Sequence, residues 1–190
     1  MIRFSGLIAA VVAFAVGTPA LADDTCHDLW FTRNLVMDRA GYCFGSVLGK
    51  AVFDNAGCSG KSVSLDRRTQ ALVSRVRGLE KDLACKVDTA QPVLVLDDID
   101  IRRRLSDLPV RDEFESACIG WRLDPLPLRS GHSAGAGIVG EIRRGDSVGF
   151  RHYAVDGWNY VTVTDRNWRL KSAGWTDAAF GIDDCEQFAG

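Results

Sequence analysis

Residues 126–176 decide the fold of this chain. They read LPLRSGHSAGAGIVGEIRRGDSVGFRHYAVDGWNYVTVTDRNWRLKSAGWT. Short apolar runs, in which apolar and polar residues alternate, are separated by glycine and aspartate turns at intervals of about 8–12 residues, a spacing typical of all-β folds. Alternation with a period of two places every second side chain on the same face of a strand. The stretch therefore predicts a small antiparallel β-barrel.

The order of the motifs in this stretch resembles that of a bacterial SH3-like domain (SH3b). That family has an L-x-V-R-S-G segment, then V-I-G-x-L-x-x-G-D-x-V, and then two G-W dipeptides. The corresponding residues of this chain lie at 126–131, 138–148, 157–158 and 174–175. The resemblance covers about a third of the chain and implies an SH3-like barrel over residues 117–190.

The resemblance also implies where a ligand would bind. Barrels of this type have a groove between the first long loop, here residues 130–137, and a later hairpin, here residues 153–158. Aromatic side chains in such a groove suit peptides or sugars because they present broad, rigid and partly polar faces. The predicted groove residues are His132, Tyr153, Trp158, Tyr160 and Trp175.

Two features of this region leave alternatives open. Trp158 and Trp175 can equally fill the core of a small barrel. The segment over residues 165–171 is longer than a tight turn and departs from the family pattern. It projects a tryptophan between basic residues and is a second candidate contact point, formed by Arg166, Trp168 and Arg169.

The N-terminus has the composition of a secretory signal peptide. Met1–Arg3 supplies a positive charge, Leu7–Val16 is apolar, and Ala20–Ala22 is a small-x-small cleavage site. We predict a signal peptide at 1–22, a mature start at Asp23 and a periplasmic or secreted location. The apolar stretch is too short to span a bilayer, so we expect no membrane partner after cleavage.

The cysteine count and two helical patterns describe the first half of the chain. All six cysteines follow the predicted cleavage site, and an even number in an oxidising compartment favours three disulfides. Residues 26–40 predict a helix with a capping box at Thr25 and Asp28. Residues 64–84 predict a second helix, capped by Ser64.

These two helices restrict the disulfide pairing. A helix rises about 1.5 Å per residue, so the cysteines at its two ends are too far apart for a disulfide, which needs about 4.4–6.8 Å between Cα atoms. In an antiparallel hairpin, the start of the first helix instead meets the end of the second. The predicted pairs are Cys26 with Cys85, Cys43 with Cys58, and Cys118 with Cys185, the last at the two ends of the barrel.

The first helical segment carries a further pattern, made of Arg33-Asn34, Arg39, Gly41-Tyr42, Phe44 and Phe53. This order resembles the YARHG domain, a secreted module of unknown function. Three positions depart from its central signature, namely Met37, Asp38 and Ala40. The matched positions also have a structural interpretation, in which the glycine ends a helix, the aromatics form a core and the arginines pair with carboxylates.

The chain therefore divides into an N-terminal α part and a C-terminal β part, an α+β fold. We expect a cysteine-stapled helical module at 23–88, an ordered connector at 89–116 that docks onto one of the modules, and the barrel at 117–190. Within the connector, Val93–Leu96 predicts a buried strand. Arg102–Arg104 follows three aspartates, which predicts a self-paired and solvated helix face.

Two short motif matches do not carry function. Gly131–Gly135 fits the G-x-S-x-G nucleophile elbow, which needs a strand before it, a helix after it and a large parallel sheet. The prolines before it and the strand pattern after it predict an exposed loop instead. Gly135–Gly140 fits the G-x-G-x-x-G dinucleotide fingerprint, but that motif must open a helix, so we expect no cofactor.

Metals and nucleic acids are not expected ligands. The three histidines and six cysteines lack the short spacings of zinc sites. The net charge is −2 and the basic cluster adjoins aspartates, which disfavours a nucleic-acid surface.

These observations favour an exported, non-enzymatic cell-envelope protein that uses its barrel to bind a peptide, a glycan or a protein partner. A serine hydrolase that uses Ser133 is one alternative, and it predicts labelling by serine-directed reagents. A purely structural or inhibitory protein is another, and it predicts a flat polar surface in place of an aromatic groove.

Overall fold

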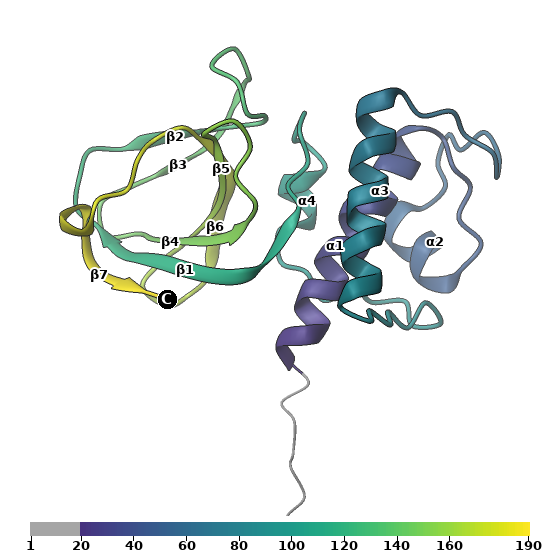
Figure 1. Cartoon of the computed structure of the whole chain (residues 1–190), viewed down its shortest axis with the longest axis horizontal. Coiled ribbons are helices and arrows are strands. Elements are labelled where there is room, and N and C mark those ends of the chain that lie inside the picture. The colour runs from purple at the N-terminus through teal and green to yellow at the C-terminus, as the bar shows by residue number, and fades with distance from the viewer. Residues whose placement is uncertain (1–19) are drawn as a thin grey trace, which may run out of the picture.

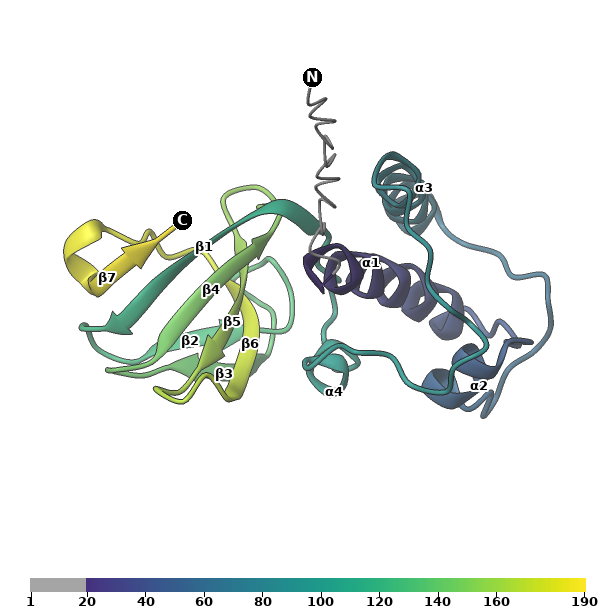
Figure 2. The same ribbon diagram turned by 90° about the horizontal axis from the view of Figure 1, so that it is seen from below.

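The computed structural model describes residues 20–190 and places a helical part beside a sheet (Figure 1). After a turn of 90°, α1 (Ala20–Arg39) lies between the sheet and α3 (Arg67–Asp82), as Figure 2 shows. The predicted signal peptide lies outside the described residues except for 20–22, which begin α1. The α+β class expected from the sequence is confirmed.

Both predicted long helices form, but each begins at a different residue from the one expected. The capping box at Thr25 and Asp28 is wrong, because α1 already begins at Ala20 and both residues lie inside it. The cap of α3 is Asp66 rather than Ser64, because the Asp66 side chain accepts a hydrogen bond from the backbone N–H of Thr69 at 2.9 Å. The two shorter helices are α2 (Val47–Phe53) and α4 (Ile99–Arg102).

An aromatic core holds α1 and α2 together. The rings of Phe31 and Phe44 stack on Phe53 from two sides, with centroids 5.7 Å and 4.6 Å away. A second contact joins α1 to α3, where Leu29 and Val76 are fully buried. The helical part therefore has two apolar clusters, one on each side of α1, and the burial of both stabilises it.

The three predicted disulfides are confirmed. Cys26–Cys85, Cys43–Cys58 and Cys118–Cys185 have Cα atoms 5.4, 5.0 and 5.5 Å apart. The first bridge ties the N-terminal half of α1 to the residues that follow α3, as an antiparallel hairpin requires.

The C-terminal part is one antiparallel sheet of seven strands in the order β3-β2-β6-β5-β4-β1-β7. In chain order the strands are β1 (Arg111–Trp121), β2 (Leu126–Arg129), β3 (Ile138–Ile142), β4 (Ser147–His152), β5 (Asn159–Thr164), β6 (Leu170–Thr176) and β7 (Cys185–Ala189), with a short 3₁₀ turn η1 (Ile182–Asp184) before the last. The sheet curls around a core that includes Leu128, Ile142, Val148, Val161 and Val163 (Figure 1).

The sheet is open, so the closed barrel expected from the sequence does not form. β3 pairs with β2 and β7 pairs with β1, and these two strands end the order. Closure would need a hydrogen-bonded ladder between the two end strands. Instead, β7 is held along β1, where Trp121 faces Cys185 across the register.

The connector departs from two expectations. Val93–Leu96 forms no strand. Val93 and Val95 are 69% and 59% exposed, while Leu94 is buried in the helical core and Leu96 packs against it. Arg102 is 1% exposed rather than solvated. The expected docking does occur, and it involves both parts, because Leu94 joins the helical core while Leu105 packs with Trp175 of the sheet.

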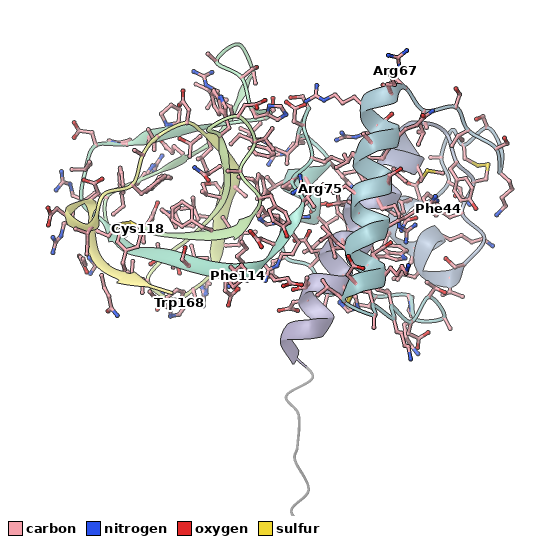
Figure 3. All side chains as sticks on the ribbon, viewed as in Figure 1. Phe44, Arg67, Arg75, Phe114, Cys118 and Trp168 are labelled. Atoms are coloured by element: carbon pink, nitrogen blue, oxygen red, sulfur yellow. A yellow bond between two sulfur atoms is a disulfide. The ribbon has the colours of Figure 1, made fainter. Side chains whose placement is uncertain are left out.

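Side chains fill the space between the connector, the helices and the sheet (Figure 3). Within residues 20–190, none of the helices has the length and apolar character needed to cross a membrane.

The disulfides should differ in their contributions to stability. Replacing Cys26 and Cys85 by alanine should lower the free energy of unfolding by about 4 kcal/mol, because the bridge closes a loop of 59 residues in the unfolded chain. Replacing Cys43 and Cys58 removes a loop of 15 residues and should cost about 3 kcal/mol. Urea unfolding of the two double mutants measures both values, and the opposite order would contradict the loop-entropy account.

Candidate functional site

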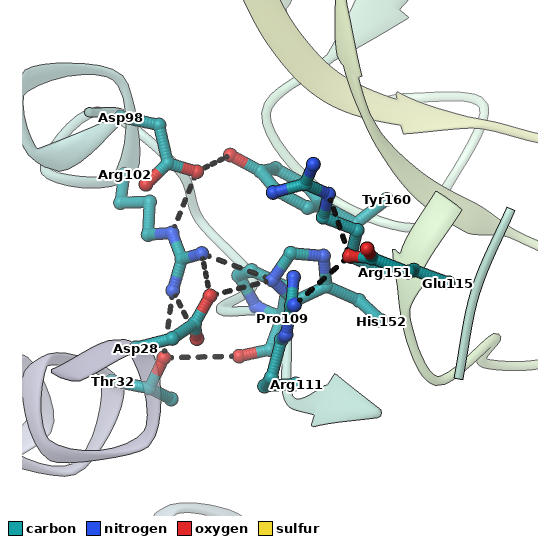
Figure 4. A network of polar contacts seen from close by, with 10 residues as sticks. All are labelled: Asp28, Thr32, Asp98, Arg102, Pro109, Arg111, Glu115, Arg151, His152 and Tyr160. Carbon is teal, nitrogen blue, oxygen red and sulfur yellow. Dashed lines mark hydrogen bonds and ion pairs between the residues drawn. The ribbon is translucent and has the colours of Figure 1, made fainter. Parts of the chain in front are cut away.

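A network of buried polar side chains joins the helical part to the sheet (Figure 4). At its centre is Arg102 of α4. Its Nη1 donates to Asp28 Oδ1 at 2.7 Å, its Nη2 donates to Asp28 Oδ2, and its Nε donates to Asp98 Oδ2 at 2.8 Å. The guanidinium therefore binds the Asp28 carboxylate through two parallel hydrogen bonds and the Asp98 carboxylate through Nε. Bidentate, charge-assisted hydrogen bonds of this kind are among the strongest that arginine forms.

The sheet contributes two further side chains to this network. The Tyr160 hydroxyl of β5 donates to Asp98 Oδ2 at 2.8 Å. His152 Nε2 of β4 lies 3.0 Å from Asp28 Oδ2 and 2.9 Å from Arg102 Nη2. Thr32 Oγ1 of α1 accepts from Arg102 and donates to the backbone carbonyl of Pro109 at 3.1 Å. The network thus connects α1, α4, the end of the connector, β4 and β5.

Local rules explain part of this geometry. Asp98 and Arg102 are four residues apart at α4, so they meet along one helix face. Asp28 and Thr32 are likewise one turn apart on α1 and point to the same side. His152 packs edge-on against Tyr160, with ring centroids 4.9 Å apart, which orients both rings toward the carboxylates.

The charges of the network follow from burial and pairing. Burial opposes ionisation of Asp28, but the Arg102 charge outweighs it and holds the Asp28 pKa well below its usual value. Burial lowers the pKa of His152, which leaves its imidazole neutral at pH 7. Burial and the adjacent Asp98 raise the pKa of Tyr160, so its phenol keeps the proton that it donates. Asp28 and Arg102 form a buried ion pair.

The five predicted groove residues come together on the side of the sheet that faces the connector and α3. Tyr160 and Trp175 are 1% and 0% exposed and belong to the core, which is the alternative left open for Trp175. The Trp175 Nε1 donates to the backbone carbonyl of Asp107 at 2.8 Å. Trp158 is half-buried and packs against the same cluster, which contains Leu105 of the connector. The connector therefore covers most of the predicted groove.

His132 and Tyr153 remain at the edge of that covered groove. His132 Nε2 lies 2.8 Å from Arg68 Nη2 of α3, and its ring stands edge-on to Trp175. The guanidinium of Arg75, also on α3, lies over the Tyr153 ring at 4.3 Å from its centroid. His132 and Tyr153 are therefore each in contact with an arginine of α3.

These contacts border a cavity of about 360 Å³ between the sheet and helices α1 and α3, which we call the interdomain cleft. Its apolar lining is formed by Val36, Leu72, Leu108, Val110 and Val155. Its charged and polar lining includes Arg39, Arg68, Arg75, Asp107, His132 and Tyr153. The cleft falls within the size range of small-molecule and peptide-side-chain pockets.

The second predicted contact point, formed by Arg166, Trp168 and Arg169, lies away from the interdomain cleft. Trp168 is 66% exposed in the hairpin between β5 and β6 (Figure 3), and Arg166 and Arg169 are exposed beside it. Its backbone φ of 61° is left-handed, which is rare for a bulky residue. This hairpin is not among the segments that border the interdomain cleft.

The sequence did not predict this network, although some of its residues were predicted to have other roles. The arginines at 102–104 were expected to pair with the aspartates before them on a solvated face, and Arg102 does pair with Asp98, but the pair is buried. Asp28 was expected to cap a helix, and His152 was not among the predicted site residues. In the structure Ser133 is exposed in the loop, while His152 is buried in the network.

Comparison with protein families identifies both halves of the chain. Residues 84–190 match the domain of unknown function DUF4453. The chain belongs to the DUF4453 family. Residues 6–81 match the YARHG domain, as the sequence pattern predicted. No curated protein and no solved structure matches the chain. The DUF4453 match includes α4, Arg102, His152 and Tyr160, while Asp28 lies in the YARHG match, so the buried network joins the two matched regions.

Removing the central charge should be costly. Arg102→Met leaves two buried carboxylates without their cation and should lower the free energy of unfolding by about 3–5 kcal/mol. Arg104→Met makes the same change at an exposed neighbour and should alter stability by less than about 0.5 kcal/mol. Chemical denaturation compares the two variants, and equal losses would contradict a central role for Arg102.

The network should also make stability depend on pH. The folded pKa of His152 is lowered, so the unfolded chain takes up a proton first and stability falls as the pH drops below about 6.5. The pKa of Asp28 is lowered as well, so a further loss follows below about pH 4. In urea titrations from pH 8 to pH 3, His152→Gln should flatten the first part of this curve. His132→Gln is the control, and an identical change in both variants would assign the slope to other groups.

Proposed function

We propose that this protein is an exported, non-enzymatic binding protein of the cell envelope, in which an SH3-like sheet and the YARHG module together hold a peptide, glycan or protein partner. Within that class, the interdomain cleft fits a peptide segment with an acidic side chain best. The observation that carries the proposal is the cleft itself, where His132 and Tyr153 from the sheet meet Arg39, Arg68 and Arg75 from α1 and α3.

The composition of the cleft supports a peptide ligand. Apolar side chains from both parts of the molecule line it, which suits the burial of an apolar side chain. The arginines outnumber the carboxylates of Asp66 and Asp107, and the Asp107 carboxylate already pairs with Arg68 at 2.7 Å. Arg75 is exposed and lies over the Tyr153 ring, and its N–H groups would donate to a carboxylate of the ligand. A carboxylate on the ligand would find the complementary charge here.

The export and the SH3-like character have separate support. Three disulfides among six cysteines are typical of an oxidising compartment outside the cytoplasm. The hairpin β2–β3 and the meander β4–β5–β6 follow the order of motifs in the SH3-like pattern. Their loops carry His132, Tyr153 and Trp158, three of the residues that the pattern assigns to ligand contact.

A non-enzymatic role is supported by the positions of the candidate catalytic groups. His152 follows Ser133 in the sequence, but its Nε2 is engaged by Asp28 and Arg102 in the buried network. His132 is engaged by Arg68. Ser133 lies in an exposed loop that leads into β3 rather than into a helix, so the strand-turn-helix of a nucleophile elbow is not formed.

Charge reversal in the cleft tests the proposal. The protein is used to select binders from a displayed library of acidic peptides, and affinities of the selected peptides are measured by calorimetry. Arg75→Glu should weaken binding by more than about 1 kcal/mol, the usual threshold for a meaningful contact. The loss should shrink at high salt because exposed charges are screened.

The matched control is Arg77→Glu. Arg77 is also exposed on α3 but does not line the cleft, so its reversal should leave peptide affinity unchanged. Equal losses in the two variants would indicate a general charge effect, and failure to select any acidic peptide would contradict the proposed ligand class.

A further inference from the structure

Two cavities adjoin each other on the outer face of the sheet. Their volumes are about 250 and 280 Å³. Arg151, Thr162, Thr164 and Trp168 line both of them, so they form one continuous groove, which we call the outer groove. None of these four residues lines the interdomain cleft, and Trp168 lies well apart from Arg75 of α3 (Figure 3). The outer groove is therefore a separate site.

Short side chains from three neighbouring strands form the floor of the outer groove. Ala117 of β1 lies opposite Gly149 of β4, which in turn lies opposite Thr162 of β5. Val161 and Val163, on either side of Thr162, are buried in the core of the sheet. Because side chains alternate between the two faces of a strand, Thr162 points to the outer face. The floor is therefore low and flat, with room for an extended chain above it.

The β5–β6 hairpin holds an accessible tryptophan beside this floor. Trp168 is 66% exposed and lines both cavities. Asp165 organises the turn, because its Oδ1 accepts from the backbone N–H groups of Asn167 and Arg169 at 2.7 and 3.0 Å, and its carbonyl accepts from Trp168 at 3.0 Å. Asparagine or glycine would adopt the left-handed backbone of Trp168 with less strain. A bulky residue held in such a backbone conformation beside a groove supports a functional role for its side chain.

The outer groove carries an excess of negative charge. Five carboxylates and three guanidinium groups line its two cavities. Most of these charges are paired with one another, in the buried network and in the contact between Glu115 and Arg151 at 3.2 Å. The exceptions are Asp24 and Asp97, which are exposed and form no ion pair with any described residue. The unpaired charge of the groove is therefore both negative and accessible.

These accessible groups suit a basic side chain. A lysine or arginine side chain would bring a positive charge to the free carboxylates. Its cation and its methylene chain can also lie on the face of an exposed indole such as that of Trp168. An acidic side chain would be repelled by Asp24 and Asp97, and an uncharged one would leave both without a partner. The groove therefore selects for positive charge.

We propose that the outer groove binds an extended peptide of a partner protein, and that a lysine or arginine side chain of this peptide lies on Trp168 beside Asp97. Two adjoining cavities give room for several residues, which suits a peptide rather than a single amino acid. This site goes beyond the role proposed for the interdomain cleft and does not depend on it, since the two sites select ligands of opposite charge.

Titration with short peptides, followed by NMR of the ¹⁵N-labelled protein, tests this site. The probes are acetylated and amidated alanine pentapeptides whose central residue is lysine, arginine, norleucine or glutamate. The lysine and arginine peptides should shift the indole N–H resonance of Trp168 and bind at least about fivefold more tightly than the norleucine peptide, because a cation–π contact and an exposed ion pair each contribute modestly. The glutamate peptide should bind most weakly. Equal affinities of the lysine and norleucine peptides, or no shift of the Trp168 resonance, would overturn the proposal.

Two variants locate the binding, and a third is their control. Trp168→Asn removes the indole and suits the left-handed backbone, so it should lower affinity for the lysine peptide at least about fivefold while the melting temperature stays equal or rises. Asp97→Asn keeps the shape of the side chain, removes its charge and should weaken both the binding and its salt dependence. Asp183→Asn makes the same change at an exposed residue of η1 that lines neither cavity, and affinity should stay unchanged. Unchanged affinity in both groove variants, or an equal loss in Asp183→Asn, would contradict the assignment.

The two proposed sites are tested separately by exchanging their variants. Arg75→Glu should weaken the binding of acidic peptides in the interdomain cleft but not the binding of the lysine peptide. Trp168→Asn should have the opposite effect, so either proposal can fail while the other holds. Loss of lysine-peptide binding in Arg75→Glu, or of acidic-peptide binding in Trp168→Asn, would show that the two ligands share one site and would overturn the assignment to the outer groove.

Discussion

The buried guanidinium of Arg102 is the constraint on which the rest of the structure depends. A charge that is almost fully removed from water is tolerated only where carboxylates surround it, and here Asp28 and Asp98 do so. Asp28 comes from α1, whereas Arg102 and Asp98 come from the connector. The helical part therefore cannot shift relative to the connector without separating buried opposite charges.

The sheet is tied to the same point through Tyr160 and His152. Tyr160 donates to Asp98, and its ring is part of the cluster that contains Trp175 and Leu105. A polar contact and an apolar core thus meet at one residue. Because hydrogen bonds to buried charges have strict geometry, the network specifies how the two parts sit against each other, while the apolar surface supplies most of the favourable free energy.

This docking creates two cavities. The interdomain cleft requires α3 to stand opposite the sheet loops, and a second cavity of about 280 Å³ is lined by Asp98 and Arg102 together with Arg111 and Trp168. Neither the YARHG region nor the DUF4453 region forms either cavity alone, since residues of both line each one. Two disulfides lie within the helical part and one within the sheet, so no disulfide of the described residues joins the helices to the sheet.

The sequence by itself determined the features that arise from local rules. The two long helices, most of the strands and all three disulfides follow from periodicity and from the short reach of a disulfide. The aspartates before Arg102–Arg104 indicated that these arginines pair with neighbouring carboxylates. Tertiary structure alone decided the burial of Arg102, the enclosure of Trp175 and the open edge of the sheet. Each of these depends on which distant segment packs on a residue, as Asp28 does on Arg102 across 74 positions. Burial depends on that packing. A charged residue whose sequence neighbours predict exposure is buried when oppositely charged residues from distant parts of the chain pair with it.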